Sequence, residues 1–326
     1  MTEVKKTGKI ALLFNSRNNY KLFENIFFEH TTVDFSNYYI FNIDLDSTDQ
    51  EKELGKEVFE KYNIIDIPVD LDDPDIYCAS RCMECCIEYI EENNLDIDWI
   101  LWYSHDCHMV GDDFLERLEQ KIEENPRFNE EVGVIGFCDY GTVTVGSPIF
   151  GRGTLLGGIN EEPHVYWYEH LPDEYKEVEY FVVEAPQDNG MLFNKNLYKK
   201  FIEPDYKFIL FNWVNDISAQ FGLHGVASIT IPSLEMVDLY REKPKFGVSR
   251  SITCGGHHHK DSYRNASSLS AHWTGKYLYP RASYSSMKAQ QAGFDKQEEK
   301  YKNSIQEKII RWHVLEGPKT LDDIKD

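Results

Sequence analysis

Basic residues are scarce in this chain of 326 residues: 34 lysines and arginines face 56 aspartates and glutamates, a formal net charge of −22. A surface this acidic repels the phosphates of nucleic acids and anionic membranes, which excludes a protein that follows the DNA or RNA backbone. A local pocket for an anionic ligand remains open, especially if a divalent cation accompanies the ligand. We therefore expect no nucleic-acid partner.

Long apolar runs are also missing. No stretch approaches the roughly 20 apolar residues of a membrane-spanning helix, and the opening MTEVKKTGKIALLF contains no long apolar segment. Apolar residues make up 41% of the chain, an ordinary share for a globular protein, and suffice for one large domain or two small ones. We expect a cytoplasmic, soluble protein without a membrane span.

A secretory disulfide framework is the third absence, because the chain has seven cysteines, an odd number, and four of them crowd into CASRCMECC. The spacing of Cys78, Cys82 and Cys85 matches the cluster-binding signature of radical S-adenosylmethionine enzymes, so an iron–sulfur enzyme is one alternative. The same spacing puts these residues and Cys86 on one helical face with Tyr89. We favour a buried helix in which cysteine packs as a small hydrophobe.

Short apolar runs alternate with amphipathic stretches through the first 140 residues. Strands are predicted at residues 9–16, 38–43, 63–70, 99–103 and 132–137, and helices at residues 20–23, 51–62, 78–93 and 113–122. Asp113 and Glu116 are spaced as a capping pair for the last of these helices. The alternation predicts an α/β fold with a parallel sheet.

The regular alternation ends after residue 138. GRGTLLGG (151–158) lacks the glycine spacing and the lysine of phosphate-binding loops, so we expect a surface loop. The aromatic run Tyr166–Tyr168 could stack on an acceptor sugar or pack in the interior. Further strand and helix patterns follow at residues 180–232, and a charged helix is expected at 295–312.

Polar residues end three of the predicted strands: Asn15 and Ser16, Asp44 and Asp46, and Asp106 and His108. Ligands of doubly wound sheets bind beyond the carboxyl ends of the strands, so these side chains should gather at one edge. Carboxylates there can accept hydrogen bonds from a ribose or a base. Asp106 and His108 are spaced to share one divalent cation in an extended segment.

Three segments resemble those of GT-A glycosyltransferases, especially family-2-like enzymes, and the resemblance covers roughly residues 8–270. WILWYSHDCHMVGDDFLERL is similar to the strand that runs into the Asp-x-Asp motif. NGMLFNKNLYKKF resembles the segment that lines the sugar and acceptor pocket, and FNWVNDISAQFGLHG resembles the later helix with an acidic pair. Two positions depart from the family: His108 replaces the second aspartate of the motif, and Asn215 replaces one acid of the pair.

The resemblance implies a GT-A fold, with a mostly parallel central sheet and helices on both faces, over residues 1–270 and a C-terminal helical extension over 271–326. It implies an inverting transfer of sugar from a nucleotide-diphosphate sugar to a glycan or another hydroxyl acceptor. Asp188, Asn189 and Gly190 would contact the sugar. Asp216 would be the base that deprotonates the acceptor hydroxyl.

A divalent cation, Mn²⁺ or Mg²⁺, is also implied by the resemblance. Asp106 and His108 would bind it, together with a late histidine from GGHHH, where His257 and His259 share a face in an extended segment. Arg250 and Arg264 flank that cluster and could meet diphosphate oxygens. A non-catalytic relative that binds nucleotide sugars is the second alternative, because the altered metal motif could have lost activity.

Overall fold

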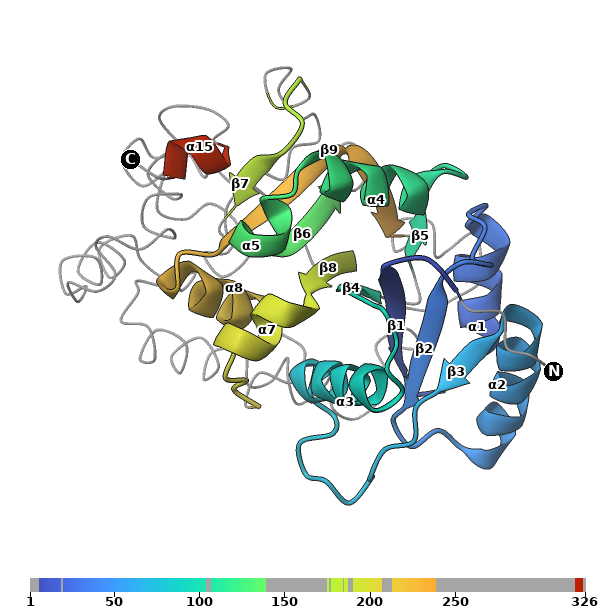
Figure 1. Cartoon of the computed structure of the whole chain (residues 1–326). Helices are drawn as coiled ribbons and strands as arrows, with labels where there is room; N and C mark the ends of the chain where they lie inside the picture. The colour runs from blue at the N-terminus through green and yellow to red at the C-terminus, as the bar shows by residue number, and fades with distance from the viewer. Residues whose placement is uncertain are drawn as a thin grey trace, which may run out of the picture.

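The computed structural model describes residues 6–18, 20–103, 107–138, 175, 177–183, 185–186, 190–206, 213–238 and 320–324. These residues form a nine-stranded sheet with the order β3-β2-β1-β4-β8-β6-β9-β5, and β7 pairs with β9 (Figure 1). The strands are β1 (Ile10–Ser16), β2 (Tyr39–Asp44), β3 (Ile64–Asp66), β4 (Trp99–Tyr103), β5 (Cys107–Met109), β6 (Val132–Cys138), β7 (Phe181–Val183), β8 (Gly190–Asn194) and β9 (Ala227–Asp238).

The sheet is mostly parallel. In the described part of the chain, β8, β5 and β7 run against the other six strands. The five strands predicted for the first 140 residues are all present as β1, β2, β3, β4 and β6. They were readable from the sequence because strands covered on both faces are nearly continuous apolar runs.

Helices cover both faces of the sheet, as predicted (Figure 1). One face carries α3 (Ala79–Glu92), α7 (Lys195–Phe201) and α8 (Trp213–Leu223), and the other carries α1 (Tyr20–Phe23), the π-helix η1 (Glu24–Phe28), α2 (Asp49–Tyr62), α4 (Phe114–Glu124) and α5 (Phe128–Glu131). Alternation along β1 separates the two cores. Ala11 and Leu13 pack toward α3, whereas Leu12 and Phe14 pack toward α1.

Local signals explain where α2 begins and ends, but they mislead for α4. The Thr48 side chain accepts a hydrogen bond from the Glu51 amide at 3.4 Å, and Asn63 ends α2 in the left-handed region at φ 53°. Asp113 occupies the cap position of α4, yet its side chain makes no capping bond. Its carboxylate instead lies 3.7 Å from Arg117, so the predicted capping pair is wrong.

The cysteine-rich stretch is a helix, α3, as the sequence analysis favoured. Cys82 and Cys86 are fully buried in the core, and Cys78 donates to the Tyr206 carbonyl at 2.8 Å. Burial raises the pKa of the Cys78 thiol to about 12. Iron–sulfur ligands are thiolates, and across the described residues no three His, Cys, Asp or Glu side chains are grouped to hold a metal. This packing argues against the iron–sulfur alternative.

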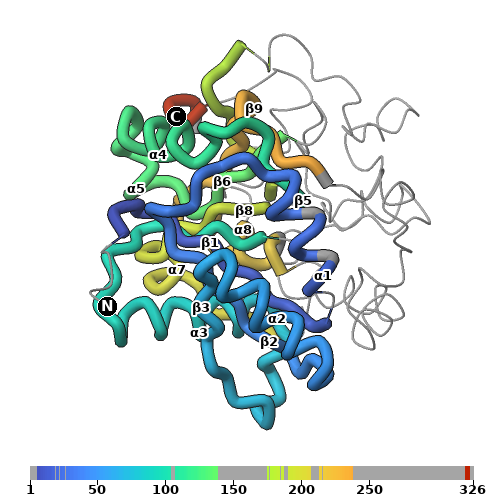
Figure 2. The backbone as a smooth tube through the Cα atoms, turned by 90° about the vertical axis from the view of Figure 1, so that its right-hand side faces the viewer, coloured from blue at the N-terminus to red at the C-terminus, as the bar shows by residue number. Residues whose placement is uncertain are grey.

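The last described helix, α15 (Leu321–Ile324), returns to the body of the protein beside β7 (Figures 1 and 2). Leu321 is 3% exposed within the same core as Phe128, and Asp322 pairs with Arg127 at 2.5 Å. The predicted boundary at residue 270 and the predicted helix at 295–312 lie outside the described residues. None of the described helices combines the length and the apolarity needed to cross a membrane.

Candidate functional site

The carboxyl ends of β1, β2 and β3 are joined by a buried polar ladder. The Ser16 hydroxyl donates to Oδ1 of Asn42 at 2.6 Å, and Nδ2 of Asn42 donates to Asp66 at 2.8 Å. Asn42 has no exposed surface, so these bonds satisfy its amide inside the sheet. Burial raises the pKa of Asp66, although the bond from Asn42 opposes this effect. Because the Ser16 proton is engaged, the hydroxyl can offer a ligand only its lone pairs.

The turn after β2 is fixed by Asp44. One carboxylate oxygen accepts from the Ser47 amide at 2.8 Å, and the Tyr20 hydroxyl donates to the other. Burial, and then this bond, raise the pKa of Tyr20. Asp46 follows at φ 63°, a left-handed conformation, and half of its side chain is exposed (54%). Of the two predicted carboxylates, Asp46 therefore has the more accessible oxygens, while Asp44 shapes the turn.

Asn15 is half-buried at the end of β1, where it pairs in register with Ile43 of β2. The sheet thus brings the predicted residues Asn15, Ser16, Asp44 and Asp46 to one edge, as the sequence analysis expected. Asn42 was missed. The signal was a polar residue inside the apolar run YIFNID, where an amide must find partners within the protein.

The end of β4 lies beside the start of β8. Tyr103 pairs with Gly190, and a Cβ added to Gly190 would lie 2.3 Å from the Cε of Met236. Only glycine fits this position without a shift of Met236. Gly190 thus lies beside the last residue of β4, at the edge where the predicted sugar contacts were expected, but Asp188 and Asn189 are outside the described residues.

Asp216 is held in the first turn of α8, close to the same edge. The Trp213 ring lies 5.2 Å from the Trp102 ring of β4, which fixes the start of α8 against that strand. Asp216 is 2% exposed, and Nε2 of Gln220 donates to its Oδ2 at 2.9 Å. Gln220 also donates to the Glu203 carbonyl at 2.9 Å and accepts from the Glu203 amide at 2.7 Å.

Gln220 therefore joins the candidate base to the chain segment that follows α7. The sequence analysis missed it, although a glutamine four residues after an aspartate lies on the same helical face. The Tyr198 ring of α7 lies in the same buried region, and burial, with the charge of Glu84, raises the pKa of its hydroxyl. Tyr198 remains neutral there at ordinary pH.

The predicted metal ligands are described only in part. His108 lies in β5, paired with Val237 of β9, and its ring centroid is 6.0 Å from that of His30. Asp106, His257 and His259 lie outside the described residues, as do Arg250 and Arg264. Imidazole suits Mn²⁺ less than a carboxylate but can bind it. One described ligand does not define a coordination sphere, so the metal site remains a prediction.

The fold and this edge define an α/β protein with a polar ligand-binding face at the ends of β1, β2 and β4. No protein-family model matches the chain, and no curated protein matches it. Solved structures of similar fold include S. aureus TarS 1–349 in complex with UDP-GlcNAc, at 13% identity over 70% of this chain and 58% of that chain, with a TM-score of 0.42.

The mannosyltransferase PcManGT from Pyrobaculum calidifontis, in complex with GDP-Man and Mn²⁺, is 9% identical over 95% of this chain and 86% of that chain, with a TM-score of 0.45. GalNAc-T7 with UDP, GalNAc and Mn²⁺ is 11% identical over 71% and 43%, with a TM-score of 0.47. The chain spans 36% of one TarS chain and 60% of a shorter one. Likeness at this level concerns the backbone arrangement and assigns no substrate.

Proposed function

We propose that the protein is a glycosyltransferase that moves a sugar from a nucleotide-diphosphate sugar to an acceptor hydroxyl with inversion. The observation that carries the proposal is the position of Asp216, a carboxylate buried at 2% exposure whose helix is fixed against β4 by Trp102 and Trp213. A carboxylate in this position suits a general base for a hydroxyl acceptor.

The nucleoside would lie over the ends of β1 and β2, with Asp46 and Asn15 as its polar contacts. The sugar would lie toward Gly190, and Asp216 would take the proton of the attacking hydroxyl as the anomeric carbon bonds to the acceptor oxygen. Asp106 and His108, with a late histidine, would hold Mn²⁺ or Mg²⁺. When bound, the cation would neutralise the charge that develops on the departing nucleotide diphosphate.

Donor binding is the first measurement. A thermal-shift panel of nucleotide sugars with and without Mn²⁺, starting with UDP-GlcNAc and GDP-Man, should raise the melting temperature for at least one donor. No stabilisation by any nucleotide sugar would count heavily against the proposal. Binding without release of free nucleotide, in the presence of candidate acceptors, would instead favour the non-catalytic relative.

Asp216→Asn tests the base. The variant should retain donor binding and lose transfer, because the amide cannot accept the proton of the acceptor. Asp49→Asn is a matched control, since Asp49 is also an acid in the first turn of a helix. If Asp216 acted only as a helix-terminal charge, both variants would behave alike. Retained transfer in Asp216→Asn would refute its role as base.

A further inference from the structure

Arg17 differs from the other three arginines of the described chain. Arg81, Arg117 and Arg127 each donate a hydrogen bond of 3.2 Å or shorter to a carboxylate or a carbonyl oxygen. Arg17 directly follows Ser16 of β1, and its nearest ion pair, from Nη2 to Asp46, is a long 3.9 Å. Within the described residues its Nη1 atom is buried and has no hydrogen-bond partner.

The guanidinium is nevertheless held in place. It lies 5.9 Å from the centroid of the Tyr77 ring, and only 23% of the side chain is exposed. A buried N–H group without an acceptor costs about 1–3 kcal/mol, more when the group is charged. A half-buried arginine could usually avoid that cost by turning its donors to water. A ligand oxygen at Nη1 would remove it.

The strand order shows which part of a donor passes this point. The sequence β3-β2-β1-β4 puts Arg17 at the end of the strand between β2, with Asp44 and Asp46, and β4, which leads to Gly190. Neighbouring strands lie about 4.8 Å apart. A nucleoside over β2 and a sugar near β4 would place the connecting diphosphate above β1.

We propose that Arg17 donates from Nη1 to a phosphate oxygen of the nucleotide-diphosphate donor. This inference rests on the proposed function and adds a binding residue that neither the strand-end pattern nor the resemblance assigned. The bond is charge-assisted, and the planar guanidinium can use two donors at once. In a chain of net charge −22, such a cation also offsets the general repulsion of a diphosphate.

The test is titration calorimetry of the full chain with UDP and GDP, and with uridine and guanosine. Arg17→Gln should weaken diphosphate affinity at least tenfold and change nucleoside affinity less than twofold. Arg17→Lys keeps the charge without the planar fork and should fall between the two. Melting temperatures of both variants establish that they fold.

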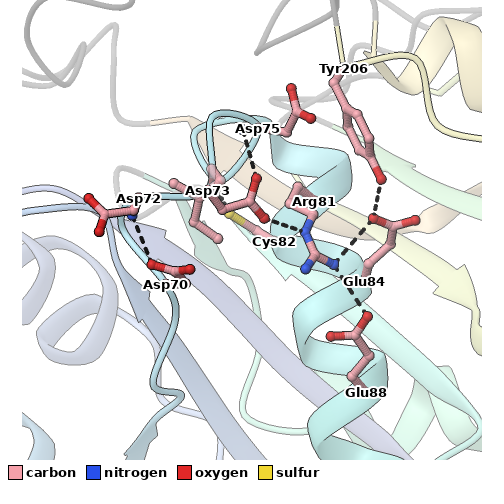
Figure 3. Close-up of polar contacts among 10 residues, drawn as sticks. Asp70, Asp72, Asp73, Asp75, Arg81, Cys82, Glu84, Glu88 and Tyr206 are labelled. Atoms are coloured by element: carbon pink, nitrogen blue, oxygen red, sulfur yellow. Dashed lines mark hydrogen bonds and ion pairs between the residues drawn. The ribbon is translucent and has the colours of Figure 1, made fainter.

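Arg81→Gln is the matched control, because Arg81 is an equally accessible arginine (25% exposed) whose partners are Asp73 and Glu88 on the α3 side (Figure 3). It should lose stability and keep diphosphate affinity. Wild-type affinity in both Arg17 variants would overturn the inference, as would an equal loss for diphosphates and nucleosides. A wild-type protein that binds none of these nucleotides would overturn the proposed function as well.

Discussion

Replacing Gln220 by leucine tests whether the candidate base depends on its neighbour. The change keeps the side-chain size and removes three hydrogen bonds, one to Asp216 and two to the backbone of Glu203. Glu203 is exposed, so water can replace its two bonds at little cost. Asp216 is 2% exposed and loses a donor that water cannot readily replace.

The expected loss of stability follows from these exposures. A hydrogen bond to a charged group contributes about 1.5–3 kcal/mol, and the two solvated backbone bonds add less. The free energy of unfolding should therefore fall by about 2–4 kcal/mol. Urea unfolding should show a lower midpoint with an unchanged slope, because the area exposed on unfolding stays the same.

The pH dependence of transfer separates positioning from simple support. The Gln220 amide stabilises the ionised form of the carboxylate, so its loss should move the acidic limb of the pH–rate profile to higher pH. The shift should be about one unit for each 1.4 kcal/mol of that bond. Tyr198 from α7 and Glu84 from α3 lie near the same carboxylate. Neither is changed in the variant.

Tyr206→Phe is the matched control. It removes the bond of 2.6 Å from Tyr206 to Glu84 at the other end of the same segment (Figure 3). It should cost about 1 kcal/mol and leave the acidic limb in place. A Gln220→Leu variant that loses stability but retains the wild-type acidic limb would refute the view that Gln220 acts through the carboxylate.

Two further predictions concern the ladder behind the nucleoside edge. Asn42→Leu should cost about 1–3 kcal/mol, because it leaves the Ser16 hydroxyl buried without an acceptor, and adding Ser16→Ala should restore most of that loss; a double variant no more stable than the single one in urea would contradict this. Burial raises the pKa of Asp66 above its ordinary 3.8, so the folded protein binds this proton more tightly than the unfolded chain and loses stability as the pH rises through that interval. Asp66→Asn should therefore be more stable than wild type at pH 7 but not at pH 3, and an equal difference in urea midpoints at the two pH values would rule this out.

The elements near the site were predictable because each depends on local sequence. β1, β2 and β4 are apolar runs, and α2 has a threonine cap and an asparagine end. The pairing of β5 with β9 was not predictable in this way. His108 meets Val237 across 129 intervening positions of sequence number, and no local pattern encodes that register. The bond from Gln220 to Glu203 has the same character.

Side-chain pairing also explains why a polar residue at a strand end is an incomplete signal for ligand binding. Ser16 and Asp44 satisfied the pattern, yet the Ser16 proton goes to Asn42, and the Asp44 oxygens accept from Ser47 and Tyr20. These bonds fix the shape of the edge.

Arg17 and Asp46 stand one residue beyond the strand or two, where the backbone turns away and the sheet supplies no partners closer than 3.9 Å between them. Their hydrogen-bonding groups are the ones left for a ligand. If the proposed donor binds here, the residues inside the strands should govern stability and those just beyond them should govern affinity. The Asn42 and Arg17 variants measure these two effects separately: the first should shift unfolding with little change in diphosphate binding, and the second should do the reverse.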